Sequence, residues 1–248
     1  SGCGKTTILN MLIGFYKPTT GKIKFQSRDI RKDYKNITTI FGFASQGGSF
    51  YNELTVKENL FYFGKLYDMK SKVINARIDE LLKLLEIGHT KDYLARNMST
   101  GMQRRLDIAC ALIHNPKVLI LDEPTEDLDP LLRREVISII KKVKETGTTI
   151  ILTSHLLWQL ENLCDNIAIL NKGKIVKFDS PNNLKRIYGK KSLEEIFYVI
   201  IKETGTDVAK GLVKSALESQ KNTPKSSIPK NKSLELQEDY MFDKKTRK

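Results

Sequence analysis

The sequence predicts an α/β fold built on a largely parallel β-sheet, and three observations carry that prediction. Two continuous apolar segments, 117–123 ("KVLILDE") and 148–155 ("TTIILTSH"), have the pattern of strands that are buried on both faces. Segments with helical spacing of apolar residues precede and separate them. The 248 residues, with a hydrophobic content of 40%, suffice for one large domain or one domain with a small appendage.

Composition narrows the classes of protein to which the chain can belong. The 3 cysteines are far apart and odd in number, so we expect a reducing compartment and neither a disulfide framework nor a zinc site. No apolar run approaches the ~20 residues that cross a bilayer. The net charge of +13 permits an anionic partner, but the lysines are scattered along the chain. We therefore expect solvated lysine-rich faces and no specific nucleic-acid partner.

The first segment, "SGCGKTT" (1–7), has the second half of the phosphate-loop pattern G-x-x-x-x-G-K-[ST]. Backbone N–H groups of this loop can surround a phosphate, and the apolar run 7–13 predicts a helix whose N-terminal dipole favours the anion. Lys5 would reach the β- and γ-phosphates, and the Thr6 hydroxyl would ligate Mg²⁺. The first glycine of the pattern would precede Ser1, so we expect the chain to be a fragment truncated at its N-terminus.

The next elements form a helical insertion between strand-rich parts. Segments 21–26 and 36–44 predict short strands because they hold β-branched residues between turn residues. A capping box, T-V-K-E, begins a helix at Thr55, and segment 71–87 has one apolar face at helical spacing. We place a helical subdomain at about 50–115.

The remaining elements complete the domain. Segment 99–115 predicts a helix, and Asp129 followed by Pro130 predicts the start of another. Segment 166–178 predicts a hairpin whose turn lies at 171–173. We place the folded domain at 1–203 and a polar, basic, disordered tail at 204–248.

Two acids follow the strand predicted within 117–123. An enzyme with a phosphate loop needs an acid at the end of a second buried strand to hold the Mg²⁺ shell, and Asp122 has that place. Glu123 comes one residue later, where it could polarise an attacking water. A strand that simply ends in solvated acids is the alternative.

A second anion-binding surface is predicted at the start of the helix at 99–115. Ser99 supplies a hydroxyl, Gly101 permits close approach of backbone N–H groups, and the helix N-terminus adds a favourable dipole. Two such surfaces on one chain suggest a dimer, in which each subunit offers its Ser99 loop to nucleotide held by the other. An ordinary capping serine would explain Ser99 alone.

Together these motifs resemble those of an ATP-binding-cassette nucleotide-binding domain. The segments 1–7 and 119–123 resemble Walker A and Walker B, and 98–103 ("MSTGMQ") resembles the signature. Segment 43–60 resembles the Q-loop and the start of the helical subdomain, 126–130 resembles the D-loop, and 153–155 resembles the segment with the switch histidine. The match runs from Ser1 to about Phe197. The stretches "STGM", "RRLDIA" and "SLEEIF" resemble the drug- and lipid-exporting branch, including daunorubicin-resistance exporters.

The resemblance implies roles for individual residues around ATP and Mg²⁺. Glu123 would be the catalytic base, His155 would contact the γ-phosphate, and Gln46 would approach the metal and link it to a membrane partner. The implied metal-binding residues are Thr6, Gln46 and Asp122. The implied nucleotide-binding residues are Ser1, Gly2, Cys3, Gly4, Lys5, Thr6, Thr7, Ser99, Thr100, Gly101 and Asp129, of which Asp129 communicates across the dimer.

The sequence also departs from the family pattern. Thr100 replaces one glycine of the signature, and Met98 and Met102 replace its usual Leu and Gln. The first strands, the aromatic residue that stacks on adenine and the first phosphate-loop glycine have no counterpart in the sequence. We therefore expect the chain as given to bind ATP weakly.

The function implied by the resemblance is that of the ATP-hydrolysing subunit of an exporter. It would bind separate transmembrane permease subunits at the cytoplasmic face of the membrane, and it would form a homodimer, or a paired cassette, with ATP sandwiched between the two. The alternative is a soluble cassette ATPase acting on nucleic acid or the ribosome. A degenerate cassette that serves only as an interaction module is disfavoured because Lys5, Glu123 and His155 are all present.

Overall fold

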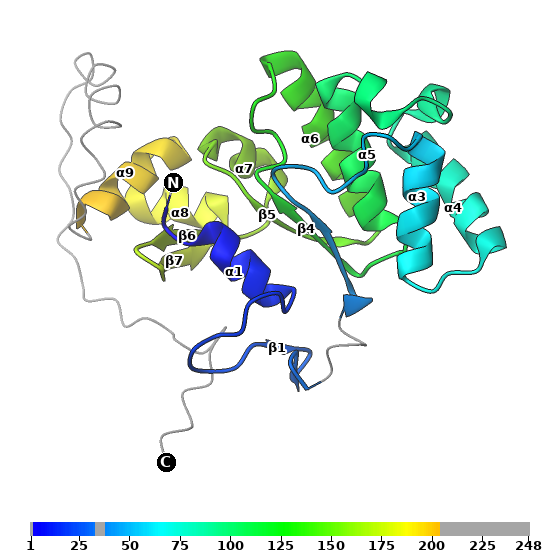
Figure 1. Ribbon diagram of the computed structural model, residues 1–248. Helices are drawn as coiled ribbons and strands as arrows, with labels where there is room; N and C mark the ends of the chain where they lie inside the picture. Colours follow the sequence, from blue (N-terminus) through cyan, green and yellow to red (C-terminus); the bar gives the residue numbers. More distant parts are fainter. Residues whose placement is uncertain (1, 33–37, 204–248) are drawn as a thin grey trace. The chain divides into compact units, whose positions relative to one another are not determined.

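The computed structural model describes residues 2–32 and 38–203 of the chain (Figure 1). Ser1 and the predicted tail, 204–248, lie outside the described residues. The described residues form two compact units: one comprises 5–32 and 38–155, and the other comprises 2–4 and 156–203.

A three-stranded parallel sheet forms the centre of the first unit. Its strands are β3 (Phe41–Ala44), β4 (Val118–Asp122) and β5 (Thr149–Thr153), in the order β3-β4-β5 (Figure 1). Every residue of β4 is buried, as its uninterrupted apolar sequence predicts for a central parallel strand. The predicted α/β fold with a parallel sheet is confirmed.

Helices surround this sheet. They are α1 (Lys5–Leu12), α5 (Thr100–Leu112) and α6 (Pro130–Glu145), of which α5 packs on β3 and α1 contacts β4. The side chain of Asp129 caps α6 by accepting the backbone N–H groups of Leu131 and Leu132 at 2.8 and 3.0 Å. Pro130 follows as the first helical residue, so the predicted start of α6 is confirmed.

The helical insertion consists mainly of α3 (Val56–Leu66) and α4 (Ser71–Leu84). Both partners of the predicted capping box are present, with Glu58 N donating to Thr55 Oγ1 at 3.1 Å and Thr55 N donating to Glu58 Oε2 at 2.8 Å. The two helices pack on each other and α3 also contacts α5 (Figure 1). Short 3₁₀ turns at Gly88–Thr90 and Ala95–Asn97 lead from α4 to α5.

The strand expected at 21–26 is shorter than predicted. Only Lys24–Phe25 (β1) pairs, antiparallel to Arg28–Asp29 (β2), because a turn at Gln26 and Ser27 with positive φ follows at once. Of segment 36–44, the strand comprises Phe41–Ala44, and residues 36 and 37 lie outside the described part of the chain.

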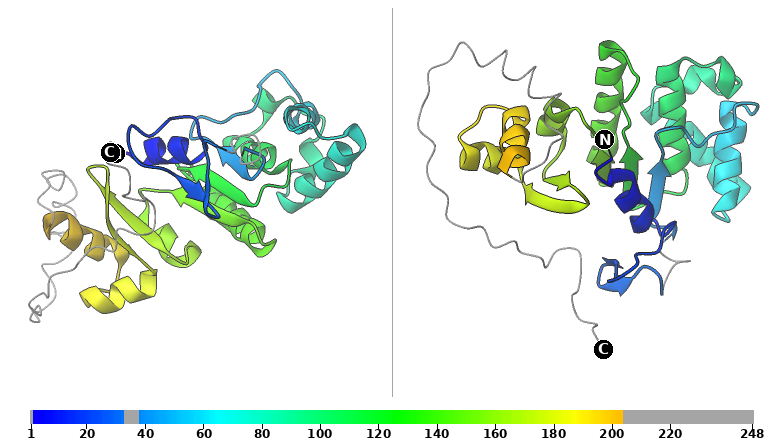
Figure 2. Two further views of the ribbon diagram at one scale, coloured as in Figure 1. Left: turned by 90° about the horizontal axis from the view of Figure 1, so that it is seen from below. Right: turned by 60° about the vertical axis from the view of Figure 1, so that its left-hand side comes forward.

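The second unit joins a hairpin to three short helices. The hairpin pairs β6 (Ile167–Asn171) with β7 (Lys174–Asp179), and its turn is at Lys172 and Gly173, both with positive φ, as predicted. The helices are α7 (Leu157–Leu163), α8 (Pro181–Tyr188) and α9 (Leu193–Glu203), and α9 packs on the other two (Figure 2). Within the described residues, no helix has both the length and the apolarity that a membrane span requires.

Candidate functional site

The site is built at the carboxyl end of β4, where Asp122 is 3% exposed. Thr6, in the first turn of α1, donates its hydroxyl to Asp122 Oδ2 at 2.8 Å. Thr153, the last residue of β5, donates its hydroxyl to the other carboxylate oxygen. The parallel register places the ends of β4 and β5 side by side, because Asp122 is the direct partner of Thr153. Hydroxyl and carboxylate oxygens are therefore gathered at one edge of the sheet.

Glu123 lies next to this edge and is 8% exposed. Its Oε1 is 3.3 Å from Lys5 Nζ, so the two predicted residues form an ion pair. Its backbone has a φ of +49°, in the left-handed region that costs energy for any residue with a Cβ. The backbone N–H of Glu123 donates to Thr153 Oγ1 at 3.0 Å, which holds the turn against β5.

His155 holds the second oxygen of the same carboxylate. Its backbone N and its ring Nδ1 lie 3.2 and 3.1 Å from Glu123 Oε2. The His155 side chain is 52% exposed, so the rest of its ring faces solvent in this structure. Five predicted residues thus meet in one cluster although the chain separates them by 150 positions. They are Lys5, Thr6, Asp122, Glu123 and His155.

Gln46 contacts the cluster through Glu126, a residue for which the sequence indicated no role. Gln46 Nε2 donates to Glu126 Oε2 at 2.6 Å. Glu126, Glu123 and His155 each bring one potential ligand atom to within 4.8 Å of the others. The sequence signal that could have indicated Glu126 is a third carboxylate, three positions after Glu123. In the structure the backbone turns here, and Glu126 N donates to Glu123 O.

The loop segment carrying Gly2 and Gly4 adopts φ values of +79° and +101°, which favour glycine. Within the second unit, the carbonyl of Cys3 accepts the N–H of Gly173 at 3.1 Å. Thr7 is exposed in the first turn of α1. Phosphate binding by Gly2, Cys3, Gly4 and Thr7 stays a prediction, and Ser1 lies outside the described residues.

The signature residues lie at the start of α5. Ser99 is exposed and caps the helix, with Met102 N donating to its hydroxyl at 3.3 Å. Thr100 is exposed, whereas Gly101 is buried where an added Cβ would lie 2.8 Å from Leu132 Cδ2 of α6. Gly101 therefore allows α5 and α6 to approach closely. In the described part of the chain, no hydrogen bond or ion pair joins Ser99 or Asp129 to the cluster around Glu123.

Two further residues of α5 hold the loop that carries Gln46. The Arg104 guanidinium donates to the carbonyls of Ser45 and Gln46 at 3.1 and 3.0 Å. The buried Asp107 accepts the backbone N–H of Ser49 at 2.7 Å, and its other oxygen is 3.8 Å from Arg104. Sequence reasoning missed this contact. The available signal was an acid between apolar residues on the buried side of a helix.

Burial has a measurable consequence for Asp107, because desolvation raises its pKa from 3.8 to about 6. Between these values the folded protein keeps a proton that the unfolded chain has released. The stability contributed by the protonated group is present below about pH 4 and is lost as the pH rises through about 6. For Asp107→Asn, we expect the free energy of unfolding, relative to wild type, to rise by about 2–3 kcal/mol between about pH 4 and 7.

Urea unfolding of wild type and Asp107→Asn between about pH 4 and 7 measures the difference in their free energies of unfolding. His114 acts in the opposite sense, since burial lowers its pKa to about 4 and stability is lost as the pH falls below 6.5. His114 is present in both proteins, so its contribution to the pH dependence of stability cancels when the two are compared. A difference in stability that does not vary with pH would show that the pKa of Asp107 is not raised in the folded protein.

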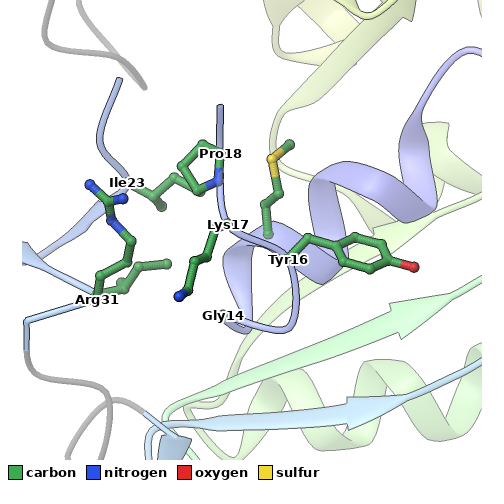
Figure 3. A pocket seen from close by; sticks show the side chains of 8 residues that line it. Gly14, Tyr16, Lys17, Pro18, Ile23 and Arg31 are labelled. Carbon is green, nitrogen blue, oxygen red and sulfur yellow. The ribbon is translucent and has the colours of Figure 1, made fainter. Parts of the chain in front are cut away.

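A separate pocket of about 240 Å³ lies beyond the other end of α1. Figure 3 shows Tyr16, Lys17 and Pro18 on one side of it and Ile23 and Arg31 on the other. Its lining holds none of the predicted site residues, so it is distinct from the cluster at Asp122.

Comparison with known proteins agrees with this geometry. The ABC transporter family model matches residues 1–126. ABC transporter A family member 7 of Arabidopsis thaliana is 38% identical over 191 residues, covering 76% of this chain and 20% of that protein. ATP-binding cassette sub-family A member 2 of Rattus norvegicus is 35% identical over 189 residues, covering 76% of this chain and 8% of that protein. The chain thus spans about a fifth of the length of its plant relatives.

Two solved structures share the fold. One is the ATP binding subunit of an ABC transporter, with a TM-score of 0.70 at 26% identity over 81% of this chain and 84% of that one. The other is cbiO1 from Clostridium perfringens, part of the ABC transporter complex cbiONQ, with a TM-score of 0.69 at 26% identity over 88% of this chain and 84% of that one. With a family model that covers 126 of its 248 residues, the chain belongs to the ABC transporter family.

Proposed function

We propose that this chain is an ATP-hydrolysing domain that drives transport by a membrane permease. The observation that carries the proposal is the position of Glu123. Its carboxylate is shared between Lys5 and His155, beside the pair formed by Thr6 and Asp122. One cluster thereby holds a candidate phosphate-binding cation (Lys5), a candidate base (Glu123) and hard oxygen donors (Thr6 and Asp122).

The oxygen donors fit Mg²⁺. Thr6 offers a hydroxyl and Asp122 a carboxylate that are already 2.8 Å apart, and oxygen ligands of this kind suit magnesium rather than softer metals. Gln46 is the proposed third contributor, through its amide oxygen. When bound with ATP, Mg²⁺ neutralises charge that develops on the phosphates.

Lys5 and Glu123 would separate when nucleotide binds. A phosphate offers Lys5 more negative charge than one carboxylate does, so Lys5 would turn to it and free Glu123 Oε1. That oxygen could then accept a proton from the attacking water. His155 keeps Glu123 oriented through Oε2. If Nδ1 donates to the carboxylate, Nε2 can donate to a γ-phosphate oxygen only in the protonated imidazolium.

Dimerisation and membrane association form part of the same proposal. Ser99 caps the 13-residue helix α5, which begins with Thr100 and Gly101. Ser99 and Thr100 are exposed, which suits contact with nucleotide held by a second cassette. Asp129 would lie near that interface. The names of the relatives, two of which are A-family transporters, favour transport over action on nucleic acid. We propose a peripheral location on the cytoplasmic face, a separate permease and export as the direction.

Replacement of Lys5 tests the proposal. In Lys5→Ala we expect the affinity for Mg²⁺ and a non-hydrolysable ATP analogue, measured by calorimetry, to fall about 10- to 100-fold, because one charge-assisted hydrogen bond is lost. Lys17→Ala is the matched control, since Lys17 lines the pocket beyond the other end of α1. Equal affinity in Lys5→Ala and wild type would refute the assignment of the phosphate site.

A further inference from the structure

The contact between Gln46 and Glu126 fixes which way the Gln46 amide points. A carboxylate can only accept hydrogen bonds, and the amide nitrogen is the only donor of the glutamine side chain. The 2.6 Å distance between Gln46 Nε2 and Glu126 Oε2 therefore directs the amide nitrogen toward Glu126 and leaves the amide oxygen to face elsewhere. With a partner that can both donate and accept, such as a hydroxyl or an amide, both orientations of the Gln46 amide would be available.

The backbone of Gln46 is held independently of this contact. Arg104 binds the carbonyls of Ser45 and Gln46, and Asp107 binds the N–H of Ser49. These bonds anchor the loop to α5 on both sides of the glycine pair 47–48. The exposed Gln46 side chain is the part of the loop left to be oriented, and Glu126 is the group that orients it.

Glu126 is itself fixed to the turn that carries the candidate base. Its backbone N–H donates to the carbonyl of Glu123 at 3.1 Å, and its side chain is half-buried. Its carboxylate lies within 4.8 Å of ligand atoms of Glu123 and His155. A glutamine that follows β3 is thereby tied to the segment that follows β4.

We propose that Glu126 is a positioning residue for Gln46, turning the amide oxygen toward the metal held by Thr6 and Asp122. The inference rests on the proposed function, in which Gln46 contributes to the Mg²⁺ shell. Glu126 acts in two ways. It excludes the amide orientation that would aim N–H groups at a cation, and its charge increases the electron density on the amide oxygen.

Metal affinity gives a readout that does not depend on turnover. Mn²⁺ binding in the presence of a non-hydrolysable ATP analogue can be followed by electron paramagnetic resonance. In Glu126→Ala we expect Mn²⁺ affinity to fall about 10-fold, as for other groups that orient a ligand. The milder Glu126→Gln, which preserves side-chain size and allows both amide orientations, should lose less. Glu53→Ala is the control, because Glu53 is an exposed acid paired with Arg96.

A double-mutant cycle separates positioning from direct ligation. In a Gln46→Ala background, Glu126→Ala should have no further effect on Mn²⁺ affinity, because the residue that Glu126 orients is gone. An equal loss in both backgrounds would show that Glu126 acts without Gln46 and would overturn the inference. So would unchanged Mn²⁺ affinity in both Glu126 variants.

The side-chain amide signal of Gln46 provides a second readout. In ¹⁵N-labelled protein without nucleotide, the Gln46 NH₂ signals are identified by their loss in Gln46→Ala. We expect the exchange of the bonded proton to accelerate about 5-fold or more in Glu126→Ala, and no change in Glu53→Ala.

If wild type fails to bind Mn²⁺ with the nucleotide, the proposed function falls and this inference with it. Normal wild-type binding without any effect at Glu126 would refute the inference alone.

Discussion

Glu123→Gln is expected to lower ATP turnover by about 10²- to 10⁴-fold, the usual contribution of a general base. The amide is the same size as the carboxylate but cannot take a proton from water. It also lacks the charge that holds Lys5 at 3.3 Å in the present structure, so Lys5 is freer to meet a phosphate. ATP binding should therefore persist or improve while hydrolysis becomes much slower. Phosphate release measures turnover, and calorimetry measures binding.

A nucleotide-bound dimer should accumulate in this variant if the dimer proposal holds, and sedimentation velocity with ATP would detect it. Glu145→Gln is a suitable control, because Glu145 is an exposed acid in the last turn of α6. Wild-type turnover in Glu123→Gln would mean that another group takes the proton. Loss of nucleotide binding together with turnover would mean that Glu123 supports the fold of the site rather than the chemistry.

Gly42→Ala should destabilise the protein by about 3 kcal/mol, the upper end of the usual cost of overpacking, because the obstructing atom belongs to the backbone. An added Cβ at Gly42 would lie 2.1 Å from the carbonyl oxygen of Ala111 and 3.0 Å from Pro116 Cγ. The oxygen belongs to the backbone of α5 and cannot rotate away as a side chain would. Relief would require β3 and α5 to separate. The shift in the midpoint of urea unfolding measures the cost.

Gly47→Ala is the matched control, because no atom lies within 4 Å of an added Cβ there. It should leave the midpoint nearly unchanged. A small effect at Gly42 would show that the packing of α5 on β3 adapts easily. A large effect accompanied by loss of Mn²⁺ affinity would show that close packing here also supports the Gln46 loop, which begins directly after β3.

The resemblance to the cassette family implied that Lys5, Thr6, Asp122, Glu123 and His155 belong to one site, and the structure brings these residues together. Asp122 and Thr153, the last residues of β4 and β5, are register partners in the parallel sheet, so both strands end at the same edge. The capping box of α3 and the turn at Lys172 and Gly173 were also predicted, since each depends on residues a few positions apart.

What was missed depends on contacts between distant segments. Arg104 and Asp107 reach a loop 58 or 59 positions away, and Gln46 meets Glu126 across 80 positions. Helical periodicity places Asp107 on a buried face but cannot name the N–H that it will accept. The role of Gly42 is equally invisible, because a glycine in a strand shows that a close approach is permitted but not which backbone approaches.

The left-handed backbone of Glu123 sets stability against activity at a single position. A φ of +49° costs a residue with a side chain about 1–2 kcal/mol, a cost that glycine does not bear. Selection for thermal resistance alone would therefore favour glycine at this position, against the contacts that the carboxylate makes with Lys5 and His155. A population of variants screened for heat tolerance without a test of ATP turnover would be expected to accumulate folded but inactive proteins that have glycine at residue 123.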